Sequence, residues 1–271
     1  MSQDTVSSVS ARLRELRGFA FDLDGTIWEG PRLLPGARAL VDDLRGSGIK
    51  VVFASNSSRH GSDVLRGRLD ELGIASAPNE MLAALDLAGE EVRRRLGTVG
   101  VLPFGTEELT EILESSGHAI VADDDWKAAK AVVVGIDPHF SYDRLRVASR
   151  AVAAGAAFFA VNMDRSFPTG PNEFDPGCGA LAEAIAVAGG VRPAGIGKPE
   201  PPLFLAAIER LGCGPHQAAM VGDSIASDIE GGRKAGMYTI WLSPEHNGPP
   251  PSCVDLHVRD LHELHRLWRP E

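Results

Sequence analysis

Residues 18–26, Gly-Phe-Ala-Phe-Asp-Leu-Asp-Gly-Thr, are the stretch that decides the fold. The apolar run Gly18–Leu23 predicts a short buried strand, and Gly25 marks the turn that follows it. Two acidic residues, Asp22 and Asp24, stand at the end of this strand. In open parallel sheets, ligands bind beyond the carboxyl ends of the strands, so the pair predicts a site as well as a strand.

The same order of elements recurs along the chain. Apolar runs at Ile49–Ala54, Ala218–Val221 and Tyr238–Leu242 predict further strands, and helical patterns lie between them. Strands that alternate with helices predict a parallel sheet covered on both faces, with right-handed crossovers. We therefore expect an α/β fold with a doubly wound, Rossmann-like parallel sheet. The expected helices are Ala37–Leu44, Ser62–Leu72 and Ser227–Ala235.

A chain of 271 residues is long for one compact domain and comfortable for two. Its middle part has a strand–helix rhythm of its own, which predicts a second, smaller α/β domain inserted into the first. We place the core at residues 1–78 and 180–271 and the insert at residues 79–179. Within the insert, the expected strands are Val99–Pro103, His118–Val121, Ala131–Val134 and Ala157–Val161, and the expected helices are Glu107–Ser115 and Tyr142–Ala154.

Composition and charge exclude several classes of protein. Apolar residues make up 44% and charged residues 24%, as in ordinary globular proteins, and no apolar run reaches the roughly 20 residues that span a bilayer. The net charge of −10 would repel polyanions, so nucleic acid is not an expected partner. The N-terminal residues lack the apolar core of a secretory signal, and the cysteines form no CxxC pair. We therefore expect a cytoplasmic protein without a disulfide scaffold and without a membrane partner.

Polar residues follow each of the predicted core strands. The stretch Ser55-Asn56-Ser57 follows the second strand and offers hydroxyl, amide and backbone N–H groups. Asp223 follows the third strand, and Asp228 comes shortly after it. Between these blocks, Lys198 supplies a cation where a helix could start, with Pro199 suited to its first turn.

These residue types together favour one chemistry. Several carboxylates at one sheet edge repel one another unless a cation joins them, and oxygen ligands favour Mg²⁺. The metal would also polarise phosphoryl oxygens, while Lys198 and the amides of residues 55–57 would bind the remaining ones. One aspartate can then attack phosphorus while its neighbour handles protons. The sequence therefore predicts a phosphoryl-transfer site.

In their order along the chain, these blocks resemble the motifs of the haloacid dehalogenase (HAD) superfamily. The blocks Asp22–Thr26, Ser55, Lys198 and Gly222–Asp228 are similar to the family's DxDGT, strand-end Ser/Thr, Lys and GDxxxxD motifs. A large α/β insert between the second and third motifs is similar to the class IIA members, the NagD-like and 4-nitrophenylphosphatase-like enzymes. Further matches lie at Val134–Ser141, Asn162–Asp164 and Pro176–Leu181.

The resemblance implies chemical roles for the acidic residues. Asp22 matches the nucleophile that forms an aspartyl-phosphate. Asp24 matches the acid/base that protonates the leaving alcohol and later activates water. The Mg²⁺ ligands would be the carboxylates of Asp22 and Asp223 and the main-chain carbonyl of Asp24. Asp228 would support these ligands without binding the ion directly.

The resemblance also implies how the substrate is held. Ser55, Asn56 and Lys198 match the phosphate-binding positions, and the insert would be a cap that closes over the leaving group and selects it. Arg165 and Phe167 in the cap loop are the candidates for substrate specificity. Pyridoxal-phosphate-specific relatives carry a histidine near the position of Phe167, which counts against a pyridoxal substrate. At Ser57 the chain departs from the usual Ser/Thr-Asn-Asn pattern, so this residue carries no assignment.

Other functions remain to be weighed against a phosphomonoesterase. A phosphomutase or phosphotransferase would use the same aspartyl-phosphate, and the sequence does not reveal whether water or a second alcohol accepts the phosphoryl group. A dehalogenase is disfavoured, because it needs no metal and usually lacks the second aspartate. A catalytically silent regulatory module is the non-enzyme alternative, although none of the matched motif residues is lost. The implied partner is a small phosphate of sugar, glycerol, glycolate or nucleotide type, and a homodimer through the cap stays open.

Several of these residues also have plain structural interpretations. Asp228 would stabilise the positive end of a helix if it lay in the first turn. His257, His262 and His265 suit a solvated helix face better than a metal cluster. Cys178, between two glycines, lacks an obvious histidine partner for a nucleophile, and its neighbours suggest a close approach of cap and core.

Overall fold

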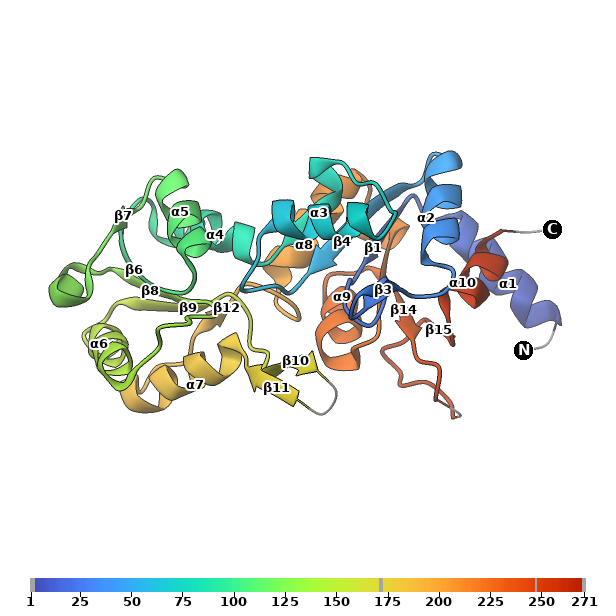
Figure 1. The fold of residues 1–271 in the computed structure, drawn as a ribbon. Coiled ribbons are helices and arrows are strands. Elements are labelled where there is room, and N and C mark those ends of the chain that lie inside the picture. Colours follow the sequence, from blue (N-terminus) through green and yellow to red (C-terminus); the bar gives the residue numbers. More distant parts are fainter. Residues whose placement is uncertain (1–2, 171–172, 247, 270–271) are drawn as a thin grey trace. The chain divides into compact units, whose positions relative to one another are not determined.

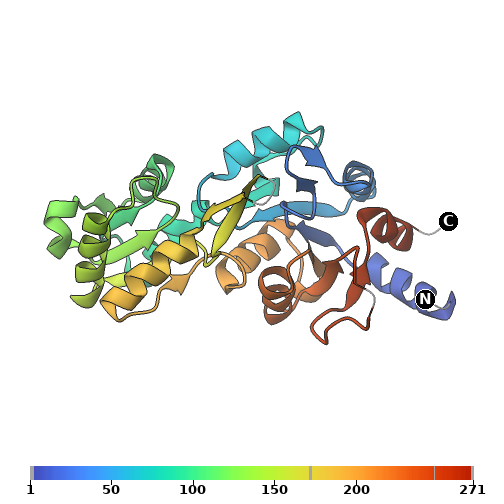
Figure 2. The same ribbon diagram turned by 60° about the horizontal axis from the view of Figure 1, so that its bottom comes forward.

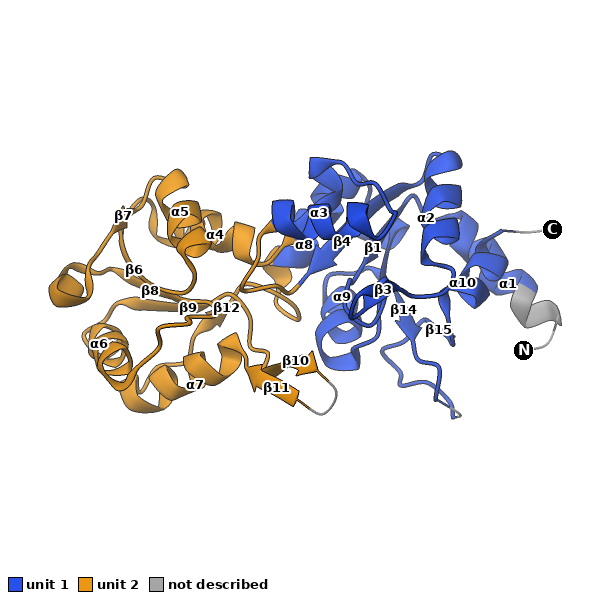
Figure 3. Cartoon of the chain, viewed as in Figure 1, with its two compact units in different colours: residues 1–55, 62–82, 203–271 blue, residues 56–61, 83–202 orange. Residues whose placement is uncertain are grey.

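The computed structural model describes residues 3–170, 173–246 and 248–269, and it confirms the predicted α/β fold class. The chain divides into two compact units, coloured separately in Figure 3. Unit 1 comprises residues 1–55, 62–82 and 203–271, and unit 2 comprises residues 56–61 and 83–202. Each unit has its own sheet (Figure 1).

Unit 1 holds a six-stranded sheet in the order β15-β14-β13-β1-β4-β5. The central strand β1 (Gly18–Phe21) pairs in parallel with β13 (Ala218–Gly222) on one side and with β4 (Lys50–Ser55) on the other. Because Phe21 is in register with both Val221 and Phe53, the carboxyl ends of these three strands meet at one edge of the sheet. The remaining strands are β5 (Met81–Ala83), β14 (Tyr238–Leu242) and β15 (Leu256–Val258).

The three central strands are continuous apolar runs because both of their faces are covered. All residues of β1 and β13 are buried, and only Lys50 of β4 is exposed. Phe19, Phe21 and Phe53 form the aromatic part of this core, with the Phe19 and Phe21 ring centroids 6.0 Å apart. Such burial is typical of parallel strands in α/β proteins.

The helices of unit 1 pack through apolar stripes. In α2 (Ala37–Gly46), Ala37, Leu40, Val41 and Leu44 are buried, the spacing of one helix face. The C-terminal helix α10 packs against both α1 and α2. The other helices are α1 (Gln3–Arg14), α3 (Ser62–Glu71), α8 (Pro201–Leu211), α9 (Glu230–Lys234) and α10 (Leu261–Trp268), and a short hairpin joins β2 (Trp28–Glu29) to β3 (Arg32–Leu33).

Unit 2 holds a five-stranded parallel sheet in the order β12-β9-β8-β6-β7. Its strands are β6 (Gly100–Phe104), β7 (Ala119–Ile120), β8 (Ala131–Val134), β9 (Ala157–Ala160) and β12 (Ala194–Gly195). Its helices are α4 (Ala88–Leu96), α5 (Glu107–Ser115), α6 (Tyr142–Ala153) and α7 (Cys178–Gly189). The antiparallel hairpin of β10 (Ser166–Gly170) and β11 (Glu173–Pro176) contacts α7, as Figure 2 shows.

The compact units end at residues other than those predicted for the insert. Unit 2 extends to Pro202, past the expected boundary near Gly179, because α7 packs on β8 and β9 and β12 pairs with β9. Helix α8 begins at Pro201, so the expectation that Pro199 lies in its first turn is wrong. A turn in which the Glu200 N–H donates to the Gly197 carbonyl (2.9 Å) occupies that position instead. None of the described helices is long and apolar enough to cross a membrane.

Candidate active site

The end of the unit 1 sheet gathers acidic side chains from distant parts of the sequence. Asp22 follows β1, Asp223 follows β13, and Asp228 lies in the π-helical turn Ile225–Ile229 just beyond. One carboxylate oxygen from each of these three residues lies within 4.8 Å of the others. Asp22 and Asp228 are 8% and 1% exposed, while Asp223 is exposed. The structure thus brings together Asp22 and Asp223, which the sequence places at strand ends, and Asp228, which follows Asp223 in the chain.

Two glycines make this close approach of the carboxylates sterically allowed. A Cβ on Gly222 would overlap the Asp228 carboxylate, and a Cβ on Gly25 would overlap that of Asp223. Gly25 also has a φ of +79°, which an L residue with a side chain rarely adopts. The donor set is made of carboxylate oxygens only. Such a set suits a hard divalent cation such as Mg²⁺, so the residues present fit the predicted metal.

Asp24 lies in a tight turn at the end of β1, and its side chain is exposed. The Leu23 carbonyl accepts hydrogen bonds from the Ile27 N–H (2.8 Å) and the Trp28 N–H (3.0 Å), which closes the turn. The indole Nε1–H of Trp28 donates to Asp24 Oδ1 at 2.7 Å. The Asp24 carboxylate is therefore oriented by an indole, and it is not part of the three-carboxylate cluster. The sequence analysis assigns no role to Trp28.

Ser55 ends β4 and is 4% exposed, so its place at the same sheet edge as Asp22 follows from the parallel pairing of β1 and β4. Its neighbour Asn56 belongs to unit 2. There Asn56 is tied to Lys198 by two hydrogen bonds: the Lys198 N–H donates to Asn56 Oδ1 (2.7 Å), and Asn56 Nδ2 donates to the Lys198 carbonyl (3.1 Å). Lys198 is 3% exposed, which excludes a solvated surface lysine.

Two further polar residues of unit 2 join this pair. Asn56 Nδ2 also donates to the Asp164 carboxylate (3.1 Å to Oδ2), and Asn162 Nδ2 donates to the Asn56 carbonyl (2.5 Å). The sequence analysis gives the stretch Asn162–Asp164 as a family match and predicts no role for it. It follows the buried strand β9, so the strand-end argument used for the core would have indicated it as well.

Arg165 and Phe167 lie where the unit 2 hairpin begins. Arg165 is exposed, and its carbonyl accepts a hydrogen bond from the Gly177 N–H (2.8 Å). Phe167 is half-buried on β10 opposite Asp175 of β11. The hairpin was not predicted from the sequence, because its strands are short and contain two prolines.

Cys178 is not suited to nucleophilic chemistry. Burial raises its pKa to about 12, and its Sγ lies 3.1 Å from the Val134 carbonyl. Side chains at Gly177 or Gly179 would overlap the backbone of Met163 and Asp164. The close approach that these glycines allow thus lies within unit 2, and the expectation that it joins cap and core is wrong.

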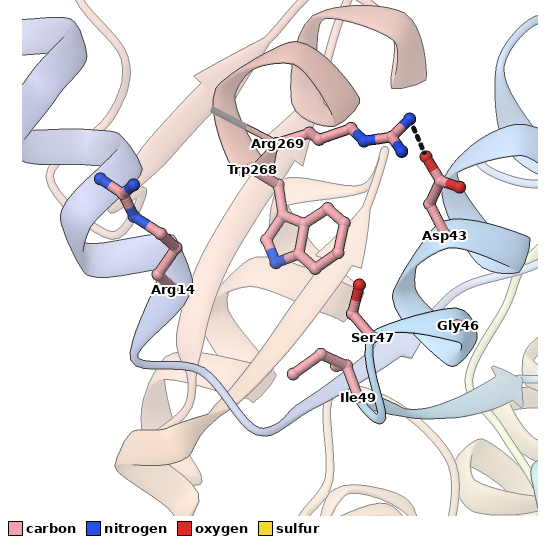
Figure 4. A pocket seen from close by; sticks show the side chains of 7 residues that line it. All are labelled: Arg14, Asp43, Gly46, Ser47, Ile49, Trp268 and Arg269. Carbon is pink, nitrogen blue, oxygen red and sulfur yellow. Dashed lines mark ion pairs between the residues drawn. The ribbon is translucent and has the colours of Figure 1, made fainter. Parts of the chain in front are cut away.

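The described C-terminal histidines make local polar contacts. His265 Nε2 lies 2.7 Å from Asp43, and His257 Nε2 lies 2.9 Å from the Ser243 carbonyl. A cavity of about 450 Å³ opens near His265 in unit 1, and Figure 4 shows that its lining contains none of the predicted site residues. Its Arg269 pairs with Asp43 (2.8 Å), so charged groups at its rim already have protein partners. The lining residues are Arg14, Asp43, Gly46, Ser47, Ile49, Trp268 and Arg269.

Comparison with known proteins agrees with this geometry. Residues 19–119 match the model of the haloacid dehalogenase-like hydrolase family, and residues 195–249 match a second model of HAD-like hydrolases. An acid sugar phosphatase of Staphylococcus aureus is 32% identical over 230 residues, which are 85% of this chain and 87% of the relative.

Solved structures show the same likeness along nearly the whole chain. A 4-nitrophenylphosphatase of Thermotoga maritima superposes with a TM-score of 0.86 at 25% identity, covering 95% of this chain and 99% of that one. A glycerol phosphate phosphatase of Mycobacterium tuberculosis, in complex with magnesium, superposes with a TM-score of 0.83 at 27% identity, covering 94% and 78%. The chain therefore belongs to the haloacid dehalogenase-like hydrolases and, within them, to the NagD-like phosphatases of class IIA, which hydrolyse phosphoric monoesters.

Proposed function

We propose that this phosphatase is Mg²⁺-dependent and hydrolyses a small phosphorylated metabolite through an aspartyl-phosphate on Asp22. The observation that carries the proposal is the cluster of Asp22, Asp223 and Asp228, with Asp24 two residues beyond Asp22 on the same strand end. A phosphoryl group is negatively charged, so neighbouring carboxylates would repel it. A cation that binds both the carboxylates and the phosphoryl oxygens would remove this repulsion.

In the first step, a carboxylate oxygen of Asp22 attacks phosphorus and forms a new P–O bond. The bond from phosphorus to the leaving alkoxide breaks, and Asp24 gives its proton to that oxygen. In the second step, Asp24 takes a proton from water, whose oxygen attacks phosphorus. The bond from phosphorus to Asp22 breaks, which releases inorganic phosphate and restores both carboxyl groups to their starting states.

The binding groups divide into those for the metal and those for the phosphate. Asp22, Asp223 and the main-chain carbonyl of Asp24 would hold Mg²⁺, with Asp228 behind them. When bound, this ion neutralises the charge of the phosphoryl oxygens. Ser55, Asn56 and Lys198 would bind the phosphate through hydroxyl, amide and ammonium donors. The two hydrogen bonds between Asn56 and the backbone of Lys198 support this role, because they hold two of the proposed phosphate-binding residues side by side.

For the substrate we propose a sugar, glycerol, glycolate or nucleotide phosphate. The relatives named as an acid sugar phosphatase and a glycerol phosphate phosphatase support this class. The second α/β unit would act as the cap that selects among these compounds, with Arg165 and Phe167 as contacts to the leaving group. Arg165→Ala and Phe167→Ala should then change the substrate ranking more than the inhibition constant of inorganic phosphate, which measures the affinity of the phosphate site. An unchanged ranking would move specificity to other residues.

The experiment that tests the proposed function is phosphate release from 4-nitrophenyl phosphate and a panel of metabolite phosphates, with Mg²⁺ and with a chelator. We expect release that the chelator abolishes and Mg²⁺ restores. Release that survives the chelator would contradict the metal, and transfer of phosphate to a second alcohol instead of water would indicate a phosphotransferase. Absence of release from every compound, with the fold intact, would contradict the proposed enzyme.

A further inference from the structure

Trp28 is a fully buried residue whose indole N–H is hydrogen-bonded to an exposed carboxylate. Its indole Nε1–H donates to Asp24 Oδ1 at 2.7 Å, and the residue itself is 0% exposed. A buried indole needs a partner for its N–H, yet many polar atoms could serve. Here the partner is the residue to which the proposed function gives the proton transfers.

The indole is fixed from several sides within unit 1. The Trp28 carbonyl accepts a hydrogen bond from the Gly25 N–H (2.8 Å), so the turn after Asp24 closes on Trp28. Trp28 begins β2 and pairs with Leu33 of β3. The Arg68 guanidinium lies over its ring, 4.5 Å from the centroid, and donates to the Gly30 carbonyl (2.6 Å). The backbone and the ring of Trp28 therefore both have contacts besides the hydrogen bond to Asp24.

We propose that Trp28 is the positioning residue of Asp24, and this inference rests on the acid/base role proposed for Asp24. An exposed aspartate samples several rotamers, whereas proton transfer requires its carboxyl oxygen within hydrogen-bond reach of the leaving oxygen. A donor fixed on Oδ1 holds the carboxyl plane and leaves Oδ2 to carry the proton. Phenylalanine would fill most of the same volume but would supply no donor, so tryptophan is required by the hydrogen bond.

The test compares Trp28→Phe with the unchanged protein on two substrates with different leaving groups. An alkyl phosphate releases a poor leaving group that needs protonation, whereas 4-nitrophenyl phosphate releases a stable phenolate that needs little. For Trp28→Phe we expect kcat/KM to fall roughly tenfold with the best alkyl phosphate of the panel and less than about threefold with 4-nitrophenyl phosphate. Equal losses on both substrates, or no loss, would overturn the inference, because a purely structural role would not discriminate between leaving groups.

A double-mutant cycle with Asp24→Asn separates this inference from the proposed function. In the Asp24→Asn background, Trp28→Phe should cause no further loss of kcat/KM with the alkyl phosphate, because its effect passes through Asp24. A full additional loss would overturn the positioning role. If Asp24→Asn alone left kcat/KM with the alkyl phosphate unchanged, the proposed acid/base role would fail first.

Two further variants control for folding. Trp126→Phe, in the 3-10 turn Asp123–Ala128 of unit 2, should leave both substrates unaffected. If Trp28→Phe does not fold, Arg68→Met keeps the indole and removes the cation that covers it, together with the hydrogen bond to the Gly30 carbonyl. Like Trp28→Phe, this variant should lower kcat/KM with the alkyl phosphate relative to kcat/KM with 4-nitrophenyl phosphate, but by a smaller factor. An unchanged ratio of these two values would contradict the inference. Melting temperatures of all variants verify the folded state.

Discussion

The two units handle their buried acids in opposite ways. In unit 1, Asp22, Asp223 and Asp228 bring carboxylate oxygens within 4.8 Å of one another. In unit 2, each buried acid lies beside an arginine: Asp137 is 2.8 Å from Arg144 Nε, and Glu91 accepts hydrogen bonds from two neighbouring arginines. Opposite charges in contact stabilise a fold locally, whereas gathered like charges repel. The acids of unit 2 thus stabilise the fold, whereas for those of unit 1 we propose a role in binding a ligand.

This difference shows how an acidic chain can hold an anionic substrate. The net charge of −10 would repel a phosphate, and the chain concentrates part of that charge at one sheet edge. Under the proposed function, a divalent cation there would reverse the local charge at the point where the substrate binds. In unit 2 the corresponding charges are already neutralised by fixed guanidinium groups, so no exogenous ion is expected at them.

The largest expected effect comes from Asp22→Asn, which removes the nucleophile. Turnover should fall by at least about a thousandfold, because the amide cannot form the aspartyl-phosphate. The melting temperature without metal should stay the same or rise, since one of three neighbouring like charges is removed. An assay of phosphate release measures the turnover, and a thermal melt measures the melting temperature. Retained turnover would contradict the assignment of Asp22 as the nucleophile. It would also contradict the proposed functional role of the unit 1 acids.

Next in size is the response of the fold to Mg²⁺. At a metal concentration 100 times the Kd, binding should stabilise the native state by about 2.7 kcal/mol, and the melting temperature should rise accordingly. Asp223→Asn should weaken this response strongly, whereas Asp143→Asn, an exposed acid on α6, should leave it unchanged. A thermal melt across a Mg²⁺ titration provides the measurement. An equal response in all three proteins would show that the metal binds elsewhere.

Asp137→Asn tests the opposite prediction for unit 2. The Asp137 side chain is 2% exposed, pairs with Arg144 and accepts a hydrogen bond from the His139 N–H (2.8 Å). Removing its charge should lower the free energy of unfolding by about 2 kcal/mol, because Arg144 loses its most buried partner. Activity per folded molecule should remain. Chemical denaturation and phosphate release decide the question, and a loss of turnover without a loss of stability would contradict a structural role.

The smallest expected effect concerns Glu91 and acid pH. Burial alone would raise the pKa of Glu91, but the hydrogen bonds from Arg94 and Arg95 more than offset this and hold it below its usual 4.5. A lowered pKa means that the pairing stabilises the fold above pH 4.5 and that this stabilisation is lost as pH falls through the folded-state pKa. Glu91→Gln should therefore melt a few degrees lower at neutral pH. The difference should vanish in acid, and a constant difference across pH would show that charge is not its cause.

Local patterns in the sequence were sufficient for much of the fold and for the acid cluster. The helices Ala37–Leu44 and Glu107–Ser115 and the strand Ala131–Val134 were recovered within two residues, because apolar periodicity is a local property. The strand-end rule located Asp22 and Asp223, since parallel strands share an edge. Neither rule predicts short elements with few apolar residues, such as β12 and the hairpin of β10 and β11.

The sequence by itself determined which residues stand at strand ends and therefore which acids could meet. Only the tertiary structure decided which side chains orient them. Trp28 reads in the sequence as one more core residue, and the bond to Asp24 exists because the turn brings the indole back onto the carboxylate. Asn56 and Lys198 are 142 residues apart, and their two hydrogen bonds depend on how the strands and turns between them pack. Periodicity describes neighbours along the chain, whereas such contacts are set by the packing of the whole unit.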